Sequence, residues 1–245
     1  MSEFPRPIRL PGESPPPREP YETTGEPLPS VVDDDTDLYG AEDAAARLAE
    51  RLKAVEPVAA RTGADGRPML APPMTSDRDR IEGPATGAVA LVVFGAHGTP
   101  WSRTLGDVLS AVRGSHLATV GVAWRHYPDP AAHPRAAVLA LAIEAAAVHG
   151  RFWSLTRELL RLHHHDPADL HAAMVRAGLE PERTVDEMRA GTGSDRIAID
   201  VASALASGVT AAPALFVDGE RYHGELGPSP VLAALDDAVA RARVR

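Results

Sequence analysis

The chain has no cysteine among its 245 residues, and both lysine and aromatic side chains are scarce. Without cysteine it can form no disulfide, no thiolate nucleophile and no cysteine-ligated metal site. Lys53 is the only lysine among 25 basic residues, and 34 acidic residues bring the formal net charge to −9. Nucleic-acid binding usually requires net basic charge or a basic face, so this balance argues against a nucleic acid as a partner.

Long apolar runs are also missing. The longest apolar stretches are 87–96 and 136–148, and Glu144 interrupts the second. Both are shorter than the roughly 18–20 apolar residues that a membrane span needs. The opening residues Met-Ser-Glu-Phe-Pro-Arg-Pro contain no apolar segment after their charges, so no signal peptide is expected. These absences predict a soluble, cytoplasmic chain with no membrane insertion.

Residues 1–36 are rich in proline and acidic side chains. They hold nine of the 23 prolines, with three Arg against eight Asp and Glu, which gives a net charge of −5. Low hydrophobicity and high net charge favour disorder, so we expect a solvated leader. A docking tail is the alternative, but no basic residue sets up a recognisable PxxP ligand pattern.

The pattern changes at residue 37. Apolar side chains recur at spacings of three and four through residue 55, which predicts a helix of about five turns. Prolines at 57, 68, 72 and 73 then make 56–83 loop-like. Residues 37–76 are therefore interpreted as a helix followed by a linker.

A compact α/β domain is predicted for the rest of the chain. The expected order is a strand, a helix, a strand, a block of helices, a two-strand hairpin and a final helix. The predicted ranges are 88–95, 100–113, 117–124, helices within 134–206, 213–217, 220–223 and about 230–243. Two parallel strands plus a hairpin, flanked by helices, are typical of a thioredoxin-like fold with a helical insertion at about 130–207.

Five stretches carry a resemblance to a known family: 77–95, 99–103, 124–137, 149–155 and 207–226. In this order they resemble the DsbA-like branch of the thioredoxin superfamily. The closest resemblance is to the bacterial group whose domain also occurs fused behind sodium/proton antiporters. It implies a DsbA-type thioredoxin domain at 77–245.

The family's activity depends on Cys-Pro-x-Cys at the start of the first helix, where this chain has Thr99-Pro100-Trp101-Ser102. Thiol–disulfide exchange needs one thiolate to attack and a second sulfur to resolve the mixed disulfide. The Thr99 and Ser102 hydroxyls can form neither bond, which excludes oxidase, reductase and isomerase activity by the family mechanism. Helix capping explains the motif without chemistry, because Thr99 is a good N-cap and Pro100 suits the first helical position.

A functional interpretation of the same residues is that one hydroxyl, at the positive end of the helix dipole, polarises a bound thiol or carbonyl. His97 is then a candidate general base, although no Asp or Glu in the local sequence would orient it. Pro213 matches the family's cis-proline. The resemblance implies that the backbone of Ala212 is free to pair with an extended peptide or with glutathione.

The run His163–His165, followed by His171, invites a metal-binding interpretation. Adjacent residues on a helix point about 100° apart, so three consecutive histidines do not converge on one ion. We therefore predict no metal site and no resident cofactor.

These observations predict a redox-inactive DsbA-family protein that serves as a binding or regulatory module. Its ligand groove would be formed by Thr99, Trp101, Ser102, Ala212 and Pro213, with a peptide or protein as the ligand. The alternative is a glutathione-dependent transferase or isomerase of the kappa-class type, which uses the Thr99 or Ser102 hydroxyl. A third hypothesis, regulation of an antiporter in trans, rests on fold-level analogy alone. The sequence leaves open the oligomeric state and whether the helix at 37–55 covers the groove, packs on the far face or mediates dimerisation.

Overall fold

The structure, a computed structural model, describes residues 40–86 and 89–244. The predicted leader at 1–36 and the first residues of the helix predicted at 37–55 lie outside the described residues. Within them, strands form a single sheet in the order β1-β2-β7-β6-β4-β5-β3. The strands are β1 (Arg61–Thr62), β2 (Pro68–Met69), β3 (Arg80–Glu82), β4 (Val89–Gly95), β5 (Val120–His126), β6 (Ala214–Val217) and β7 (Glu220–Arg221).

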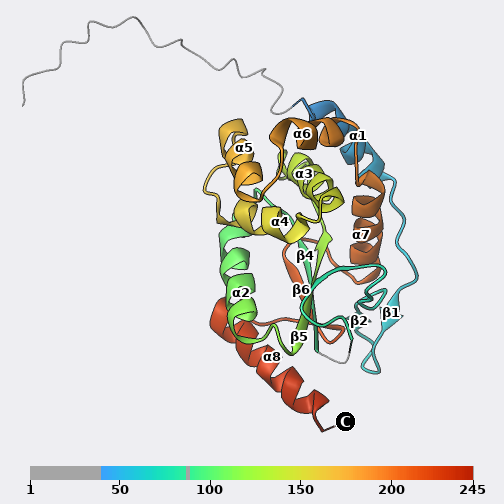
Figure 1. Cartoon of the computed structure of the whole chain (residues 1–245). Helices are drawn as coiled ribbons and strands as arrows, with labels where there is room; N and C mark the ends of the chain where they lie inside the picture. Colours follow the sequence, from blue (N-terminus) through green and yellow to red (C-terminus); the bar gives the residue numbers. More distant parts are fainter. Residues whose placement is uncertain (1–39, 87–88, 245) are drawn as a thin grey trace, which may run out of the picture. The chain divides into compact units, whose positions relative to one another are not determined.

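The two long strands β4 and β5 run parallel, and β6 pairs with β4 in the antiparallel sense. The helices are α1 (Glu42–Lys53), α2 (Ser102–Ser115), α3 (Ala136–Val148), α4 (Phe152–Arg161), α5 (Pro167–Arg176), α6 (Pro181–Arg189), α7 (Ser194–Ala206) and α8 (Pro228–Ala242). Figure 1 shows α2 and α8 along one side of the strands, α7 along the other, and α3 to α6 gathered above them. The fold is the predicted thioredoxin-like one, with a helical insertion between β5 and β6.

The side chains of strand β4 are buried on both faces of the sheet. Leu91 and Val93 belong to one buried apolar cluster, whereas Val92 and Phe94 belong to the other. A strand that is buried on both faces has a continuous apolar sequence and not an alternating one. The sequence of β4 is continuous in this sense. The strand therefore lies at the centre of the domain and carries the loop that leads into α2.

The interpretation of 56–83 as loop is wrong, because this segment supplies β1, β2 and β3 to the sheet. Strands of two or three residues leave no periodic pattern to detect, and Pro68 in β2 is itself a residue that strands usually exclude. The strand predicted at 117–124 is displaced to Val120–His126, so its end carries a buried Arg125 and a buried His126. Charged residues are rarely buried, and the apolar pattern alone does not reveal them.

Helix α1 is shorter than the 37–55 predicted for it. It packs against α3, α6 and α7, and it buries Ala44, Ala45 and Leu48. The structure therefore places α1 on the helical insertion.

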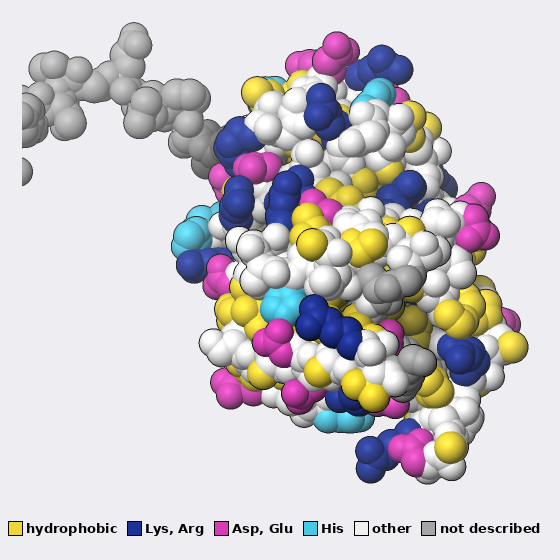
Figure 2. Space-filling view, turned by 60° about the horizontal axis from the view of Figure 1, so that its bottom comes forward, with side chains coloured by type: hydrophobic (Ala, Val, Ile, Leu, Met, Phe, Trp, Pro, Cys, Tyr) yellow, Lys and Arg dark blue, Asp and Glu magenta, His cyan; other side chains and the backbone are white. Residues whose placement is uncertain are grey.

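The surface carries charges of both signs. Figure 2 brings the lower end of the molecule in Figure 1 forward and shows Arg and Asp or Glu side chains interspersed over this face, with apolar side chains between them. No helix in the parts of the chain that the structure describes is both long enough and apolar enough to cross a membrane.

Candidate functional site

The segment Thr99–Ser102 lies in the turn that joins β4 to α2, but its capping differs from the prediction. Helix α2 begins at Ser102, two residues later than expected, and the Thr99 side chain caps no backbone N–H. Instead the Thr99 N–H donates to Ser102 Oγ over 3.1 Å, and the Ser102 N–H donates to the Thr99 carbonyl over 3.1 Å. The two hydroxyl oxygens are 3.3 Å apart. Ser102, which is buried, is therefore the residue whose side chain closes this turn.

The turn is held against the core by two glycines. Gly95 ends β4 where a side chain would overlap the Trp124 ring, and Gly98 has a φ of +72°, which favours glycine. A Cβ on Gly98 would also lie 3.0 Å from Leu139 of α3. The position of Thr99 is thus fixed by close backbone contact with β5 and the helical insertion.

Trp101 and the Ala212–Pro213 segment are the remaining residues predicted to form the groove. The Trp101 side chain is 52% exposed, whereas Trp124 is completely buried. Ala214, which begins β6, pairs with Phe94 near the end of β4, so the segment before β6 lies at the same end of the sheet as the β4–α2 turn. The Ala212–Pro213 peptide bond is cis. Ala212 forms no hydrogen bond with any other described residue, which leaves its N–H and carbonyl available to a ligand.

His97 lies inside the core and not on the surface. Its side chain is 1% exposed, and its ring centroid lies 4.7 Å from that of Trp124. No hydrogen bond joins it to Thr99. Burial holds the pKa of His97 well below its usual value, and the nearby His126 and His165 act in the same direction. A buried imidazole of such low basicity is a poor general base, so we do not include His97 in the proposed site.

We expect the free energy of unfolding to fall as the pH is lowered below about 6.5, in part because of His97. The folded chain keeps His97 neutral, whereas the unfolded chain protonates it, so the unfolded state binds more protons in this range. One such group contributes a slope of at most about 1.4 kcal/mol per pH unit. His97→Phe, which preserves a ring against Trp124, should flatten the slope measured by urea unfolding between pH 7 and pH 5. The exposed control His223→Phe should leave it unchanged, and equal slopes for all three proteins would disprove a neutral His97.

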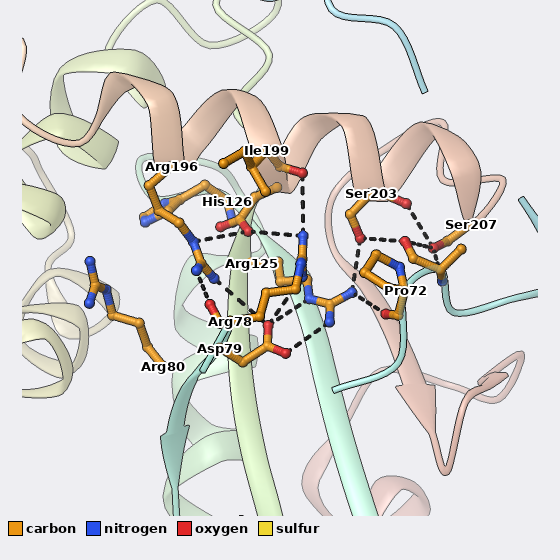
Figure 3. A network of polar contacts seen from close by, with 12 residues as sticks. Pro72, Arg78, Asp79, Arg80, Arg125, His126, Arg196, Ile199, Ser203 and Ser207 are labelled. Carbon is orange, nitrogen blue, oxygen red and sulfur yellow. Dashed lines mark hydrogen bonds and ion pairs between the residues drawn. The ribbon is translucent and has the colours of Figure 1, made fainter. Parts of the chain in front are cut away.

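Sequence analysis missed a buried charge network at the end of β5. Arg125 is fully buried, and it donates to both carboxylate oxygens of Asp79 over 2.8 and 3.0 Å. It also donates to the Pro72 carbonyl and to Ser203 Oγ, both over 2.9 Å. In Figure 3 the side chains of Arg78, Arg125 and Arg196 gather around Asp79 between β3, β5 and α7. The network fastens the segment before β3 to β5 and α7.

A second buried group, centred on Glu144 of α3, lies beside this network. His126 Nε2 is 3.2 Å from one carboxylate oxygen of Glu144, and Arg80 donates to the other over 2.6 Å. Burial raises the pKa of Glu144, but the hydrogen bonds and charges of His126 and Arg80 outweigh it and lower the pKa to about 2. Glu144 is therefore ionised at neutral pH and links α3 to the sheet.

The run of histidines does not gather. His165 is buried, and its Nε2 donates to the Leu159 carbonyl over 3.1 Å, whereas His163, His164 and His171 are exposed. Within 40–86 and 89–244, no three His, Asp or Glu side chains lie close enough together to hold a metal ion.

Comparison with solved structures finds several proteins with a similar fold. BdbD from Bacillus subtilis superposes with a TM-score of 0.59 at 14% identity, over 67% of this chain and 94% of that one. A thioredoxin-like oxidoreductase from Silicibacter pomeroyi gives 0.56 at 22% identity, over 69% and 94%. Wolbachia pipientis alpha-DsbA1 gives 0.57 at 13% identity, over 68% and 93%. The chain therefore has the thioredoxin-like fold of these proteins. No protein-family model matches it.

The sequence relatives of this chain are named as antiporters, in agreement with the resemblance stated from the sequence. It is 36% identical over 204 residues to Na(+)/H(+) antiporter NhaA 3 of Salinispora tropica, covering 81% of the chain and 31% of that protein. It is 34% identical over 177 residues to Na(+)/H(+) antiporter NhaA of Herminiimonas arsenicoxydans, covering 69% and 27%. The chain thus spans less than a third of the length of these curated relatives.

Proposed function

We propose that this DsbA-like chain is a redox-inactive binding module whose ligand surface is the groove formed by Thr99, Trp101, Ser102, Ala212 and Pro213. The chain contains no thiol at all, so it supplies neither of the sulfurs that disulfide exchange requires. The observation that carries the proposal is the exposed Trp101, which stands at the start of α2, at the same end of the sheet as the unpaired backbone of Ala212.

An extended polypeptide is the ligand that these groups suit best. A free N–H and carbonyl on Ala212 can pair with a strand-like backbone, and an exposed indole provides a large contact area at low cost in side-chain entropy. The antiporter names of the sequence relatives suggest a membrane antiporter as the natural protein partner. We propose that role in trans by analogy with those relatives. The cytoplasmic location stays a prediction.

Glutathione is the competing ligand. In a glutathione-dependent enzyme a hydroxyl at the helix start would be free to hold the thiolate. Here Ser102 is buried, its Oγ accepts the Thr99 N–H, and the Thr99 hydroxyl lies 3.3 Å from it. Both hydroxyls are therefore engaged with each other, which favours the binding module.

Calorimetric titration of a thiol-blocked, permanently unfolded polypeptide, such as carboxymethylated lactalbumin, tests the proposal. We expect saturable binding by the wild type that Trp101→Ala weakens by about 10-fold or more, because buried aromatic anchors dominate interface energies. The matched control is Val175→Ala, another exposed apolar side chain on α5, which should bind like the wild type.

Glutathione titrated into the same proteins distinguishes the two hypotheses. Saturable glutathione binding that is lost in Thr99→Ala, with no binding of the polypeptide, would overturn the module in favour of the enzyme. Equal polypeptide affinities for wild type and Trp101→Ala would also contradict the proposed groove.

A further inference from the structure

A small cavity lies between α2 and α4, along the side of the domain that faces β3. Its volume is about 60 Å³, and its walls include Leu109 and Arg113 from α2, Trp153 and Arg157 from α4, and Glu82 from β3. Helices α2 and α4 approach closely at Gly106, where a Cβ would lie 3.2 Å from Leu160. None of these residues belongs to the groove at Thr99–Ser102, so the cavity is a separate feature.

Positive charge exceeds negative charge around this cavity. Two arginines lie close to Glu82, with Arg157 Nη1 at 3.0 Å and Arg113 Nη1 at 3.6 Å from its carboxylate, and a third arginine, Arg161, also lines the cavity. Arg161 lies 3.5 Å from Glu158, outside the cavity wall. Three arginines and one acidic residue, Glu82, are therefore among the residues that line the cavity.

The surroundings of Arg157 show that its charge is only partly compensated. Burial lowers the pKa of Arg157; Glu82 opposes this shift, and the charges of Arg113 and Arg161 add to it. A further negative charge at this point would relieve the repulsion among the three arginines. Because the walls formed by Leu109 and Leu160 are apolar and buried, such a charge would interact more strongly here than at an open surface.

Trp153 of α4 contributes to the same wall. Its indole is therefore a reporter for a ligand that enters the cavity.

We propose that this cavity binds a small anion, either a carboxylate or an inorganic oxyanion. The volume admits a group of a few heavy atoms, since one water takes about 30 Å³ of liquid volume. Paired guanidinium groups match the planar, multidentate geometry of carboxylate and phosphate. This site shares no residue with the proposed groove, so an experiment can disprove one proposal and leave the other standing.

Nuclear magnetic resonance of the indole N–H groups tests this site. The chain has three tryptophans, so a ¹H–¹⁵N spectrum of the full chain shows three indole signals, and Trp153→Phe assigns one of them. Sodium acetate and sodium phosphate are titrated separately, with the ionic strength held constant by sodium chloride. We expect the Trp153 signal to shift saturably, half-maximally at roughly 1–20 mM, which is typical of so small a ligand.

The other two indoles are internal controls. Trp101 is exposed, and Trp124 is buried without a partner but lines no part of this cavity, so their signals should not follow the titration. Arg157→Met should weaken the anion at least about 10-fold, because charge-assisted hydrogen bonds are the strong ones. Arg241→Met, an exposed arginine on α8, should leave it unchanged.

The response to the two salts identifies the ligand. A shift with acetate alone indicates a carboxylate, and a shift with phosphate indicates an oxyanion. Absence of a saturable Trp153 shift with either salt would overturn the proposal. A shift that is equal in wild type and Arg157→Met, with both folded by their thermal transitions, would overturn it as well.

Discussion

Asp79→Ala is expected to lower the free energy of unfolding by about 3–5 kcal/mol, because it leaves the Arg125 guanidinium charged and unpaired in the core. Both side chains are completely buried, and Arg125 donates to both carboxylate oxygens. Asp79 also accepts the Thr75 N–H over 2.9 Å. Urea unfolding at pH 7 measures the loss.

Two further variants separate the cost of a broken pair from the value of the pair itself. Asp65→Ala removes an exposed carboxylate that lies 3.6 Å from Arg67, and it should change stability by less than about 1 kcal/mol. Combining Asp79→Leu with Arg125→Met removes both charges and should cost less than the sum of the two single changes. If Asp79→Ala were as stable as Asp65→Ala, the network would not fasten this segment to β5 and α7.

Restoring two thiols is expected to restore disulfide chemistry to a scaffold that has none. In the double variant Thr99→Cys, Ser102→Cys the two sulfurs replace oxygens that lie 3.3 Å apart at the start of α2. With oxidised glutathione the pair should form an internal disulfide, releasing two molecules of reduced glutathione, and should then oxidise a reduced unfolded protein. The wild type should show no such activity at any concentration.

The reactivity of the two introduced cysteines depends on their position at the start of α2. A cysteine at a helix N-terminus has its pKa lowered into the range of roughly 3.5–7.5. The matched control is Asp107→Cys with Ser110→Cys, which has the same spacing on an exposed part of α2 and should keep thiol pKa values near 8.5. Thiol pKa values measured by thiolate absorbance that are equal in the two variants would contradict a retained DsbA-like arrangement.

Much of the fold follows from the sequence, because long elements leave periodic signals. The apolar run of β4 and the helices α3 to α8 lie within two or three residues of their predicted positions. The motif Thr99–Ser102 could also be located, since the resemblance covers it. Its capping could not, because either hydroxyl satisfies the same turn and only the packing of Ser102 decides between them.

The charge network and the cavity between α2 and α4 could not be predicted, for a different reason. Asp79, Arg125 and Ser203 are separated by dozens of residues, and no local pattern says that they meet. The only hint was an arginine and a histidine directly after the apolar residues of β5, which reads equally well as the exposed end of a strand. Likewise, Glu82 and Arg157 come from distant elements that only the packing of α4 beside β3 brings together.

The most direct test of the proposed module is to map where an extended polypeptide binds. The backbone ¹H–¹⁵N signals of the wild type are followed as the thiol-blocked, unfolded polypeptide is added. We expect the largest changes at Thr99, Trp101, Ser102 and Ala212, with the Trp101 indole among them. Changes confined to other surfaces, or none at all, would contradict the groove as the ligand site of this thiol-free chain.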